Sequence, residues 1–268
     1  MSADEEQAAS RTGEGSGLEP LRSWLSRLAR SAADTIVPPL CLSCRQPLAT
    51  YDTLCAPCWS RVDFIRPPVC DRLGLPLPYD LGPGAVSAAA SADPPVYGRA
   101  RAVAHYGGLV RSLVTDLKFH DRDELVGLLA AWMTSAGAEI LDGADLMIPV
   151  PLSRMRLASR RFNQSARLAD GVARRAGMTC DPHSLVRVKH TRPQLGLSRT
   201  ERLDNLRGAF AVRPDRRKHI ENRRIVLVDD VVTTGTTISA AARALYSAGA
   251  ENVDVLALAL VTGGGLDA

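Results

Sequence analysis

The chain has 268 residues and a net charge of only +4, with 46% hydrophobic, 23% charged and 4% aromatic residues. This length suits one α/β domain with a small accessory module, and the scarcity of aromatic residues argues against an all-β sandwich. No apolar run approaches the roughly 20 residues of a membrane span, so we expect no membrane insertion. The acidic, polar start differs from a secretory signal, which predicts a cytoplasmic protein.

The N-terminal part is expected to combine a disordered tail with a helix and a cysteine knuckle. Residues 1–18 are polar and lack apolar periodicity, so we expect disorder there. Within residues 19–65, apolar side chains spaced i, i+3, i+4 and i+7 predict a short amphipathic helix that two prolines end. Those apolar positions are Leu21, Trp24, Leu25 and Leu28.

Four cysteines in the knuckle form two CxxC pairs separated by ten residues. Cysteines in a reducing compartment are seldom in disulfides, and two such pairs can hold Zn²⁺ tetrahedrally. A redox CxxC or four unrelated buried thiols are the alternatives, but neither explains a paired repeat. We therefore predict a structural zinc site, with the ligands Cys41, Cys44, Cys55 and Cys58.

The remainder of the chain changes from a connector to an alternation of strands and helices. Residues 66–98 are rich in proline and are expected to form a connector, and no internal repeat is apparent. Residues 99–268 predict an α/β domain with a mostly parallel sheet flanked by helices. Strands are expected at 102–106, 146–150, 224–228 and 253–261, and helices at 109–119, 125–140, 161–177 and 238–248.

The strongest chemical signal follows the apolar strand at residues 225–228. Asp229 and Asp230 come where open α/β sheets place their ligands, and a threonine-rich loop leads from them into a helix. Backbone N–H groups and hydroxyls at a helix N-terminus suit a phosphate dianion, and Gly235 permits a tight turn. An ordinary threonine-capped turn is the alternative, but it leaves the two carboxylates unexplained. The loop comprises Thr233, Thr234, Gly235, Thr236 and Thr237.

Two acidic residues followed by T-T-G-T-T resemble the phosphoribosyl pyrophosphate (PRPP) signature of type I phosphoribosyltransferases. The resemblance implies that fold, with a glycosyltransferase activity that uses PRPP and Mg²⁺. It also implies that residues 233–237 hold the 5-phosphate, while Asp229 and Asp230 accept hydrogen bonds from the ribose hydroxyls. Carboxylates at that place also suit the positive charge that develops on the ribose during transfer.

Three further motifs and the cysteine knuckle resemble the competence protein F (ComF) family. The motifs are D-L-K-F at 116–119, the run IPVPLSRMRLASRRFNQSARLA at 148–169 and QLGLSRTERLDNLRGAF at 194–210. The resemblance implies a pyrophosphate-contacting loop at 149–156 and substrate-binding residues at the next helix start, namely Arg160, Arg161, Asn163 and Gln164. It also implies a hood segment with Gln194, Arg199, Arg202 and Asn205. Arg161 stands where the family has glycine.

Three other residues of these segments receive structural interpretations. Family members often continue with a further CxxCGLPL element, but Leu73 replaces its second thiol, so Cys70 is left out of the metal site. Cys180 is expected to be a packed apolar side chain. Trp59 could stack on a base, although packing against the metal module is the favoured interpretation.

Two functions fit this sequence. Residues 151–224 contain 19 Lys or Arg against six Asp or Glu, which indicates a phosphate-rich partner, although a solvated basic face is the alternative. The first function is an enzyme, or a ligand-binding descendant of one, that takes PRPP or a nucleotide-like phosphorylated metabolite. The second is a non-catalytic accessory protein for DNA uptake, with single-stranded DNA and competence-machinery proteins as partners.

Overall fold

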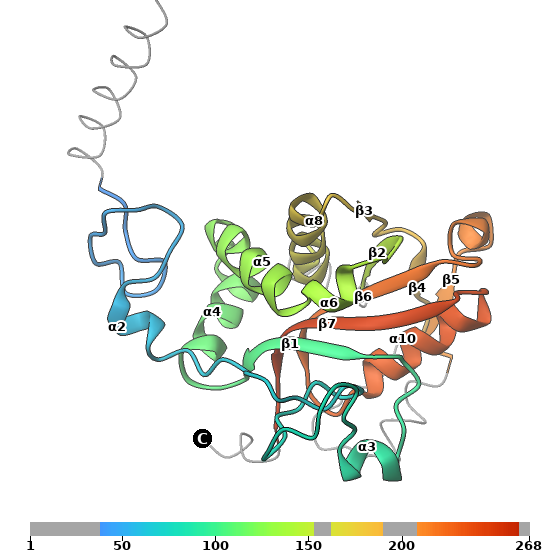
Figure 1. Ribbon diagram of the computed structural model, residues 1–268. Coiled ribbons are helices and arrows are strands. Elements are labelled where there is room, and N and C mark those ends of the chain that lie inside the picture. Colours follow the sequence, from blue (N-terminus) through green and yellow to red (C-terminus); the bar gives the residue numbers. More distant parts are fainter. Residues whose placement is uncertain (1–37, 153–161, 190–207, 263–268) are drawn as a thin grey trace, which may run out of the picture.

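The computed structural model describes residues 38–152, 162–189 and 208–262. Its centre is a five-stranded sheet in the order β1-β7-β6-β2-β3, in which every neighbouring pair is parallel (Figure 1). The strands are β1 (Ala100–His105), β2 (Leu146–Pro149), β3 (Thr179–Cys180), β6 (Arg224–Val232) and β7 (Asn252–Leu260). A separate antiparallel pair joins β4 (Leu185–Arg187) to β5 (Phe210–Val212).

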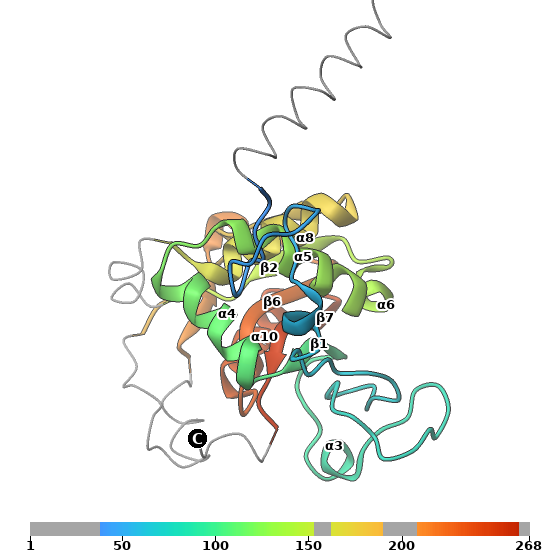
Figure 2. The same ribbon diagram turned by 90° about the vertical axis from the view of Figure 1, so that its left-hand side faces the viewer.

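Helices cover both faces of the sheet (Figures 1 and 2). One face carries α4 (Gly108–Phe119), α5 (Glu124–Ala136), α6 (Ala138–Leu141) and α8 (Gln164–Ala176), and the other carries α10 (Thr236–Ser247). Short helices α2 (Ala56–Trp59) and α3 (Ala88–Ala92) precede the sheet, and a 3-10 turn spans Pro214–His219. In the described part of the chain no helix is long and apolar enough to cross a membrane.

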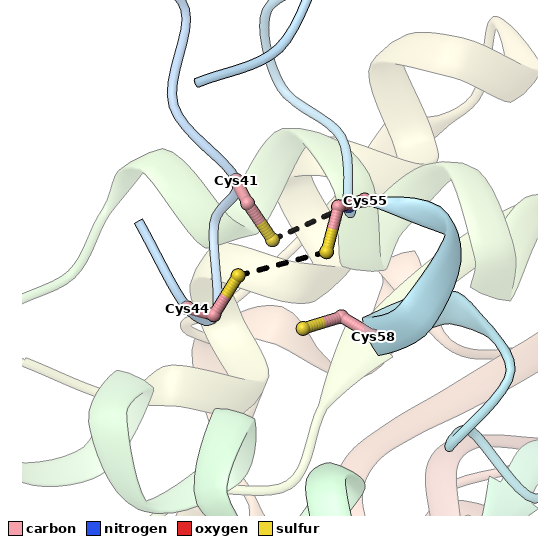
Figure 3. A group of neighbouring side chains, drawn as sticks. All are labelled: Cys41, Cys44, Cys55 and Cys58. Atoms are coloured by element: carbon pink, nitrogen blue, oxygen red, sulfur yellow. Dashed lines mark hydrogen bonds between the residues drawn. The ribbon is translucent and has the colours of Figure 1, made fainter. Parts of the chain in front are cut away.

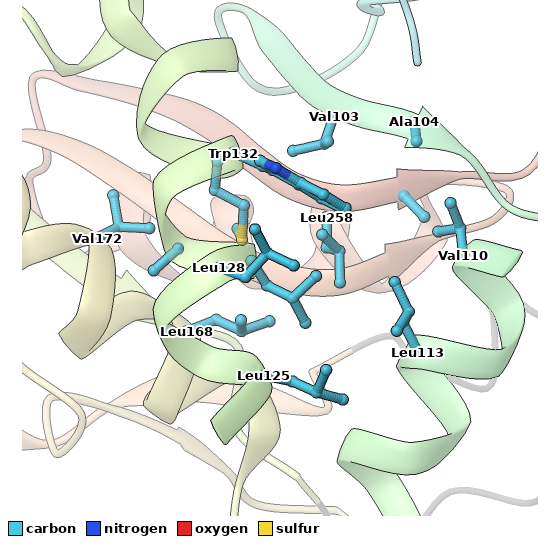
Figure 4. Packing of buried hydrophobic residues seen from close by; sticks show 14 of the residues in the cluster. Val103, Ala104, Val110, Leu113, Leu125, Leu128, Trp132, Leu168, Val172 and Leu258 are labelled. Carbon is cyan, nitrogen blue, oxygen red and sulfur yellow. The ribbon is translucent and has the colours of Figure 1, made fainter. Parts of the chain in front are cut away.

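The core consists of two layers that share the central strands. Val226 and Val228 of β6 face the layer under α5 and α8, whereas Ile225 and Leu227 face the layer under α10. Figure 4 shows the first layer, where Leu128 of α5 packs between the sheet and its neighbouring helices. A strand buried on both faces needs an uninterrupted apolar run, which explains the sequence of β6.

The predicted helix at 125–140 is wrong in its length because the helix breaks at Gly137. Helix α5 ends at Ala136, and α6 restarts at Ala138. A Cβ atom at Gly137 would lie 2.8 Å from Cδ1 of Leu256, so only glycine permits this close packing on β7. The β4–β5 pair and β3 were not predicted, and their two or three residues give too short a periodic pattern to detect.

The connections change direction between β2 and β6. From β2 the chain passes through α8 to β3, away from β6, whereas from β6 it passes through α10 to β7, away from β2. These crossovers also lie on opposite faces of the sheet. Open α/β sheets bind ligands in the crevice outside the carboxyl ends of such a pair of strands. The topology therefore places a candidate site where β2 and β6 end.

Candidate functional site

Asp229 and Asp230 lie where β6 separates from β2. Pairing with β2 stops at Pro149 opposite Val228, whereas β6 stays paired with β7 through Val232. Strand β6 extends to Val232, beyond the predicted end at residue 228. Both carboxylates therefore belong to the strand and not to the loop that follows it. They therefore sit on a rigid strand at the opening between β2 and β6.

Asp229 is held in place by hydrogen bonds from two neighbours. Its Oδ1 accepts a hydrogen bond of 2.9 Å from the hydroxyl of Ser165, at the start of α8, and one of 2.9 Å from the N–H of Asp230. Burial and the adjacent charge of Asp230 raise the pKa of Asp229 to about 7, although the Ser165 bond opposes the shift. Without a ligand, the ionised form of Asp229 is thus disfavoured.

This shift predicts that Asp229→Asn stabilises the ligand-free protein above neutral pH. The folded state binds the proton more tightly than the unfolded state, so wild type loses stability as pH rises from about 4 to about 7. The variant lacks this titrating group and keeps its stability. Above about pH 7 its free energy of unfolding should therefore exceed that of wild type by roughly 1–3 kcal/mol. Urea unfolding at acidic and alkaline pH measures this difference. An advantage that does not change with pH would contradict the raised pKa.

Asp230 forms an ion pair that the sequence did not reveal. Nζ of Lys118, near the end of α4, lies 3.0 Å from Oδ2 of Asp230, and the two side chains are only 17% and 12% exposed. Lys118 belongs to the D-L-K-F motif at residues 116–119. The motif indicated the family but did not predict that this lysine contacts Asp230. Of the two carboxylates in the site, Asp230 is therefore paired with Lys118, whereas Asp229 has a raised pKa.

The threonine-rich loop closes the site on the α10 side. Gly235 is the N-cap of α10 with φ +70°, a left-handed conformation that other residues adopt only with strain. The hydroxyls of Thr234 and Thr236 lie 2.7 Å apart. Because the first amides of a helix lack intrahelical partners, the loop directs N–H groups toward the position where a phosphate can bind.

The start of α8 faces the loop across the carboxyl ends of the strands. Asn163 caps α8 by accepting from the N–H of Ser165 at 3.1 Å, and its amide donates to the carbonyl of Val150 at 3.0 Å. Gln164 is fully buried, and neither Oε1 nor Nε2 of its side chain has a hydrogen-bond partner among the described residues. An unsatisfied buried amide is costly, so the surroundings of Gln164 differ from those of an ordinary core side chain. Arg160, Arg161 and the hood residues predicted from the family motifs lie outside the described residues.

The four predicted zinc ligands converge on one point (Figure 3). The sulfur atoms of Cys41, Cys44, Cys55 and Cys58 all lie within 4.8 Å of one another. Sγ of Cys41 accepts N–H hydrogen bonds from Ser43 at 3.5 Å and Cys55 at 3.3 Å, and Sγ of Cys44 lies 3.6 Å from that of Cys55. Four sulfur ligands at this spacing fit a tetrahedral structural zinc site.

The thiols of Cys41 and Cys55 in this cluster differ in pKa. Burial raises the pKa of Cys41, but the N–H donors of Cys55 and Ser43 outweigh it and lower the pKa to about 6. An N–H contact from Cys58 lowers the pKa of Cys55, yet burial and the neighbouring thiols raise it to about 12. The four groups cannot all become thiolates without a cation among them, and bound zinc supplies that charge.

The zinc module packs directly on the α/β domain. The ring of Trp59 lies 5.1 Å from that of Phe64 and 5.5 Å from that of Trp132 on α5. Trp59 thus packs against Phe64 and α5 rather than against the metal module, and its side chain is exposed. Arg122 reinforces the contact by donating a 2.7 Å hydrogen bond to the carbonyl of Leu42.

Comparison with known proteins agrees with both halves of this architecture. A double zinc ribbon domain matches residues 32–89, and a phosphoribosyl transferase domain matches residues 163–265. The chain is 33% identical over 231 residues to DNA utilization protein YhgH of Salmonella typhimurium, covering 83% of this chain and 97% of that protein. Competence protein F of Haemophilus influenzae is 28% identical over 225 residues, covering 82% and 96%. Competence protein ComFC of Bacillus subtilis is 28% identical over 150 residues, covering 56% and 58%.

The fold and these matches define a phosphoribosyltransferase-like domain preceded by a four-cysteine zinc ribbon. The chain belongs to the competence protein F family. The fold and the family predicted from the sequence are thus confirmed.

Proposed function

We propose that this chain binds PRPP, or a related ribose-5-phosphate ligand, together with Mg²⁺ at the carboxyl ends of β2 and β6. One observation carries the proposal. Two valines separate an acidic pair at residues 229–230 from a threonine-rich loop at residues 233–237, at the point where the sheet connections change direction. A ribose placed over Asp229 and Asp230 has its 5-phosphate within reach of Gly235 and the four loop threonines.

The carboxylates and the loop have separate tasks in this proposal. Asp229 and Asp230 accept hydrogen bonds from the ribose hydroxyls, which supply the donors that a pair of adjacent carboxylates needs. Residues 233–237 donate N–H and hydroxyl groups to the phosphate at the positive end of α10. Mg²⁺ prefers oxygen ligands and retained water, and when bound it would neutralise charge on the pyrophosphate of PRPP. The acceptor of the ribosyl group stays unnamed.

Two residues outside the signature support the same site. Lys118 neutralises Asp230, which reduces the repulsion between the acidic pair and a ligand that carries several phosphate charges. Gln164 offers a buried amide without a hydrogen-bond partner among the described residues, at the same end of the sheet. Asn163 and Ser165 hold the start of α8 against the strand ends, and the arginines at 160 and 161 complete the proposed substrate-binding set.

Thermal unfolding with and without PRPP and Mg²⁺ tests this proposal. A ligand that binds only the folded state raises the unfolding temperature, and at about 100 times Kd the stabilisation is about 2.7 kcal/mol. Pyrophosphate with Mg²⁺ serves as the control for binding of phosphate alone. An unfolding temperature that does not change with excess PRPP and Mg²⁺ would contradict the proposal that the chain binds PRPP.

A second candidate function is DNA handling in the cytoplasm, without catalysis. It is favoured by the names of the relatives, which refer to DNA utilization and competence, and by the basic excess within residues 151–224. In that case the fold and the zinc ribbon serve as a scaffold for single-stranded DNA or for proteins of the competence machinery. The two functions are compatible if ligand binding regulates the DNA-handling role.

If the basic segment binds single-stranded DNA, affinity should fall steeply with salt. Each neutralised phosphate releases counterions and contributes a slope of about −0.7 to a plot of log K against log salt concentration. Fluorescence anisotropy with a labelled oligonucleotide at several salt concentrations measures that slope. A flat dependence, or no binding at low ionic strength, leaves the phosphorylated metabolite as the partner of this segment.

A further inference from the structure

The segment that follows the zinc site repeats the backbone of the zinc site itself. We call residues 39–59 the first ribbon and residues 68–92 the second ribbon. Each begins with an antiparallel bridge, and the two bridges lie 29 positions apart, joining Leu40 to Pro47 and Val69 to Pro76. The same N–H to O hydrogen bond closes each one, from Cys41 to Gln46 at 2.8 Å and from Cys70 to Leu75 at 2.7 Å. The sequence shows no apparent repeat here, so that expectation is corrected.

The turns and helices of the two ribbons also correspond. Arg45 has φ 64° and donates to the carbonyl of Cys41, and Gly74 has φ 66° and donates to the carbonyl of Cys70. Helix α2 of the first ribbon begins after Cys55, and α3 of the second begins after Ser87. Both cap residues donate their N–H to the leading sulfur, at 3.3 Å in the first ribbon and 3.2 Å in the second.

This correspondence identifies what stands at the ligand positions of the second ribbon. Where the first ribbon has four cysteines, the second has Cys70, Leu73, Ser87 and Ala90. Leu73 and Ala90 carry no metal ligand, so at most two donors remain. The hydroxyl of Ser87 already accepts the N–H of Ala90 at 3.3 Å, whereas Cys55 makes no such cap bond. These residues do not fit a zinc ion, which needs four ligands in a structural site.

We infer that the second ribbon keeps the zinc-ribbon backbone but binds no metal, so that the chain holds one zinc ion and not two. The domain that matches residues 32–89 is described as a double zinc ribbon, and this chain departs from that description in its second half. Among the described residues, the only group of cysteine, histidine or acidic side chains close enough to hold a metal is that of the first ribbon.

Contacts with the sheet replace the metal in the second ribbon. Arg101 of β1 is 6% exposed and donates to the carbonyl of Asp71 at 2.8 Å and to its carboxylate at 2.7 Å. Arg72 donates to the carbonyl of Tyr97 at 2.7 Å. A Cβ atom on Gly74 would lie 2.4 Å from the carbonyl oxygen of Ala100, so this turn packs tightly on β1. The second ribbon is therefore anchored to the edge strand without zinc.

The second ribbon also borders the proposed phosphate loop. A cavity of about 350 Å³ lies between them, lined by Leu73, Leu75 and Ala89 on one side and by Thr233, Thr234 and Gly235 on the other. Leu73, which replaces a metal ligand, thus contributes apolar surface beside the loop. Because the sheet holds this ribbon, we expect it to keep its place when the zinc of the first ribbon is removed.

Zinc content per folded chain tests the inference. Elemental analysis should give one zinc for wild type, none for Cys44→Ser and one for Cys70→Ser, since Cys44 and Cys70 belong to different ribbons. Two zinc ions in wild type would overturn the inference, and so would a lower zinc content in Cys70→Ser than in wild type. This result does not depend on PRPP binding, so it stands or fails apart from the proposed function.

A gain of metal gives an independent test of the shared backbone. The triple variant Leu73→Cys, Ser87→Cys and Ala90→Cys restores four thiols at the positions that correspond to those of the first ribbon. We expect it to hold two zinc ions, and its Co²⁺ form to show twice the thiolate absorption of wild type. A folded triple variant with a single metal would contradict the correspondence. If the variant does not fold, the zinc counts of wild type and Cys70→Ser still decide the inference.

Discussion

Cys44→Ser should abolish zinc binding and unfold the first ribbon while the parallel sheet stays folded. A structural zinc site in a small ribbon contributes on the order of 10 kcal/mol to its folding, far more than the few apolar side chains within the ribbon can supply. Without the cation, no bond joins the two CxxC pairs, whose four sulfur atoms lie within 4.8 Å of one another.

Limited proteolysis with mass spectrometry measures this effect. We expect new cleavage within residues 41–58 of Cys44→Ser, or of wild type treated with a chelator, and continued protection of residues 68–98. Cys180→Ser is the matched control, because its thiol lies on β3 away from the ribbon, and it should retain zinc and resist cleavage. Unchanged protection of residues 41–58 after complete removal of zinc would contradict a structural role for the metal.

Replacing both Asp229 and Asp230 by Asn should preserve the fold and weaken ribose-phosphate binding by at least about 100-fold. Each lost hydrogen bond to a charged group costs about 1.5–3 kcal/mol, and each carboxylate is proposed to accept one from a ribose hydroxyl. The fold should survive because Asn keeps the size of each side chain, and relief of the repulsion between the two carboxylates offsets the lost ion pair of Asp230 with Lys118.

The separation of stability from binding distinguishes this effect from simple damage. The double variant should unfold at the same temperature as wild type or higher, yet gain no stability from PRPP and Mg²⁺. Asp215→Asn provides a matched control, because Asp215 lies before the start of β6, at the far end of the strand from the site, and pairs with Arg213. It should bind as tightly as wild type.

Local patterns were sufficient to predict the parts of the protein that depend on short stretches of sequence. The apolar run before Asp229, the glycine in the loop and the following helix occur within about 25 residues, and the structure contains all three. The spacing of the four cysteines also predicts their arrangement, because two CxxC pairs can supply the four ligands of one zinc ion.

Features that depend on distant segments could not be read in the same way. The contact of Lys118 with Asp230 requires α4 to end beside β6, and the hydrogen bond from Ser165 to Asp229 requires α8 to begin there. The helix breaks at Gly137, where a side chain would meet Leu256 of β7, a neighbour far away in the sequence. The second ribbon could not be predicted from the sequence, because three of its metal-ligand positions hold leucine, serine and alanine instead of cysteine.

Calorimetric titration of PRPP in the presence of Mg²⁺ into wild type and into the double Asn variant tests the central claim most directly. We expect saturable binding of one PRPP per chain to wild type, the same affinity in Asp215→Asn, and a loss of at least about 100-fold in the Asp229→Asn, Asp230→Asn protein. Equal affinity of wild type and the double variant, or no heat of binding to zinc-loaded wild type, would contradict a ribose-phosphate site at the end of β6.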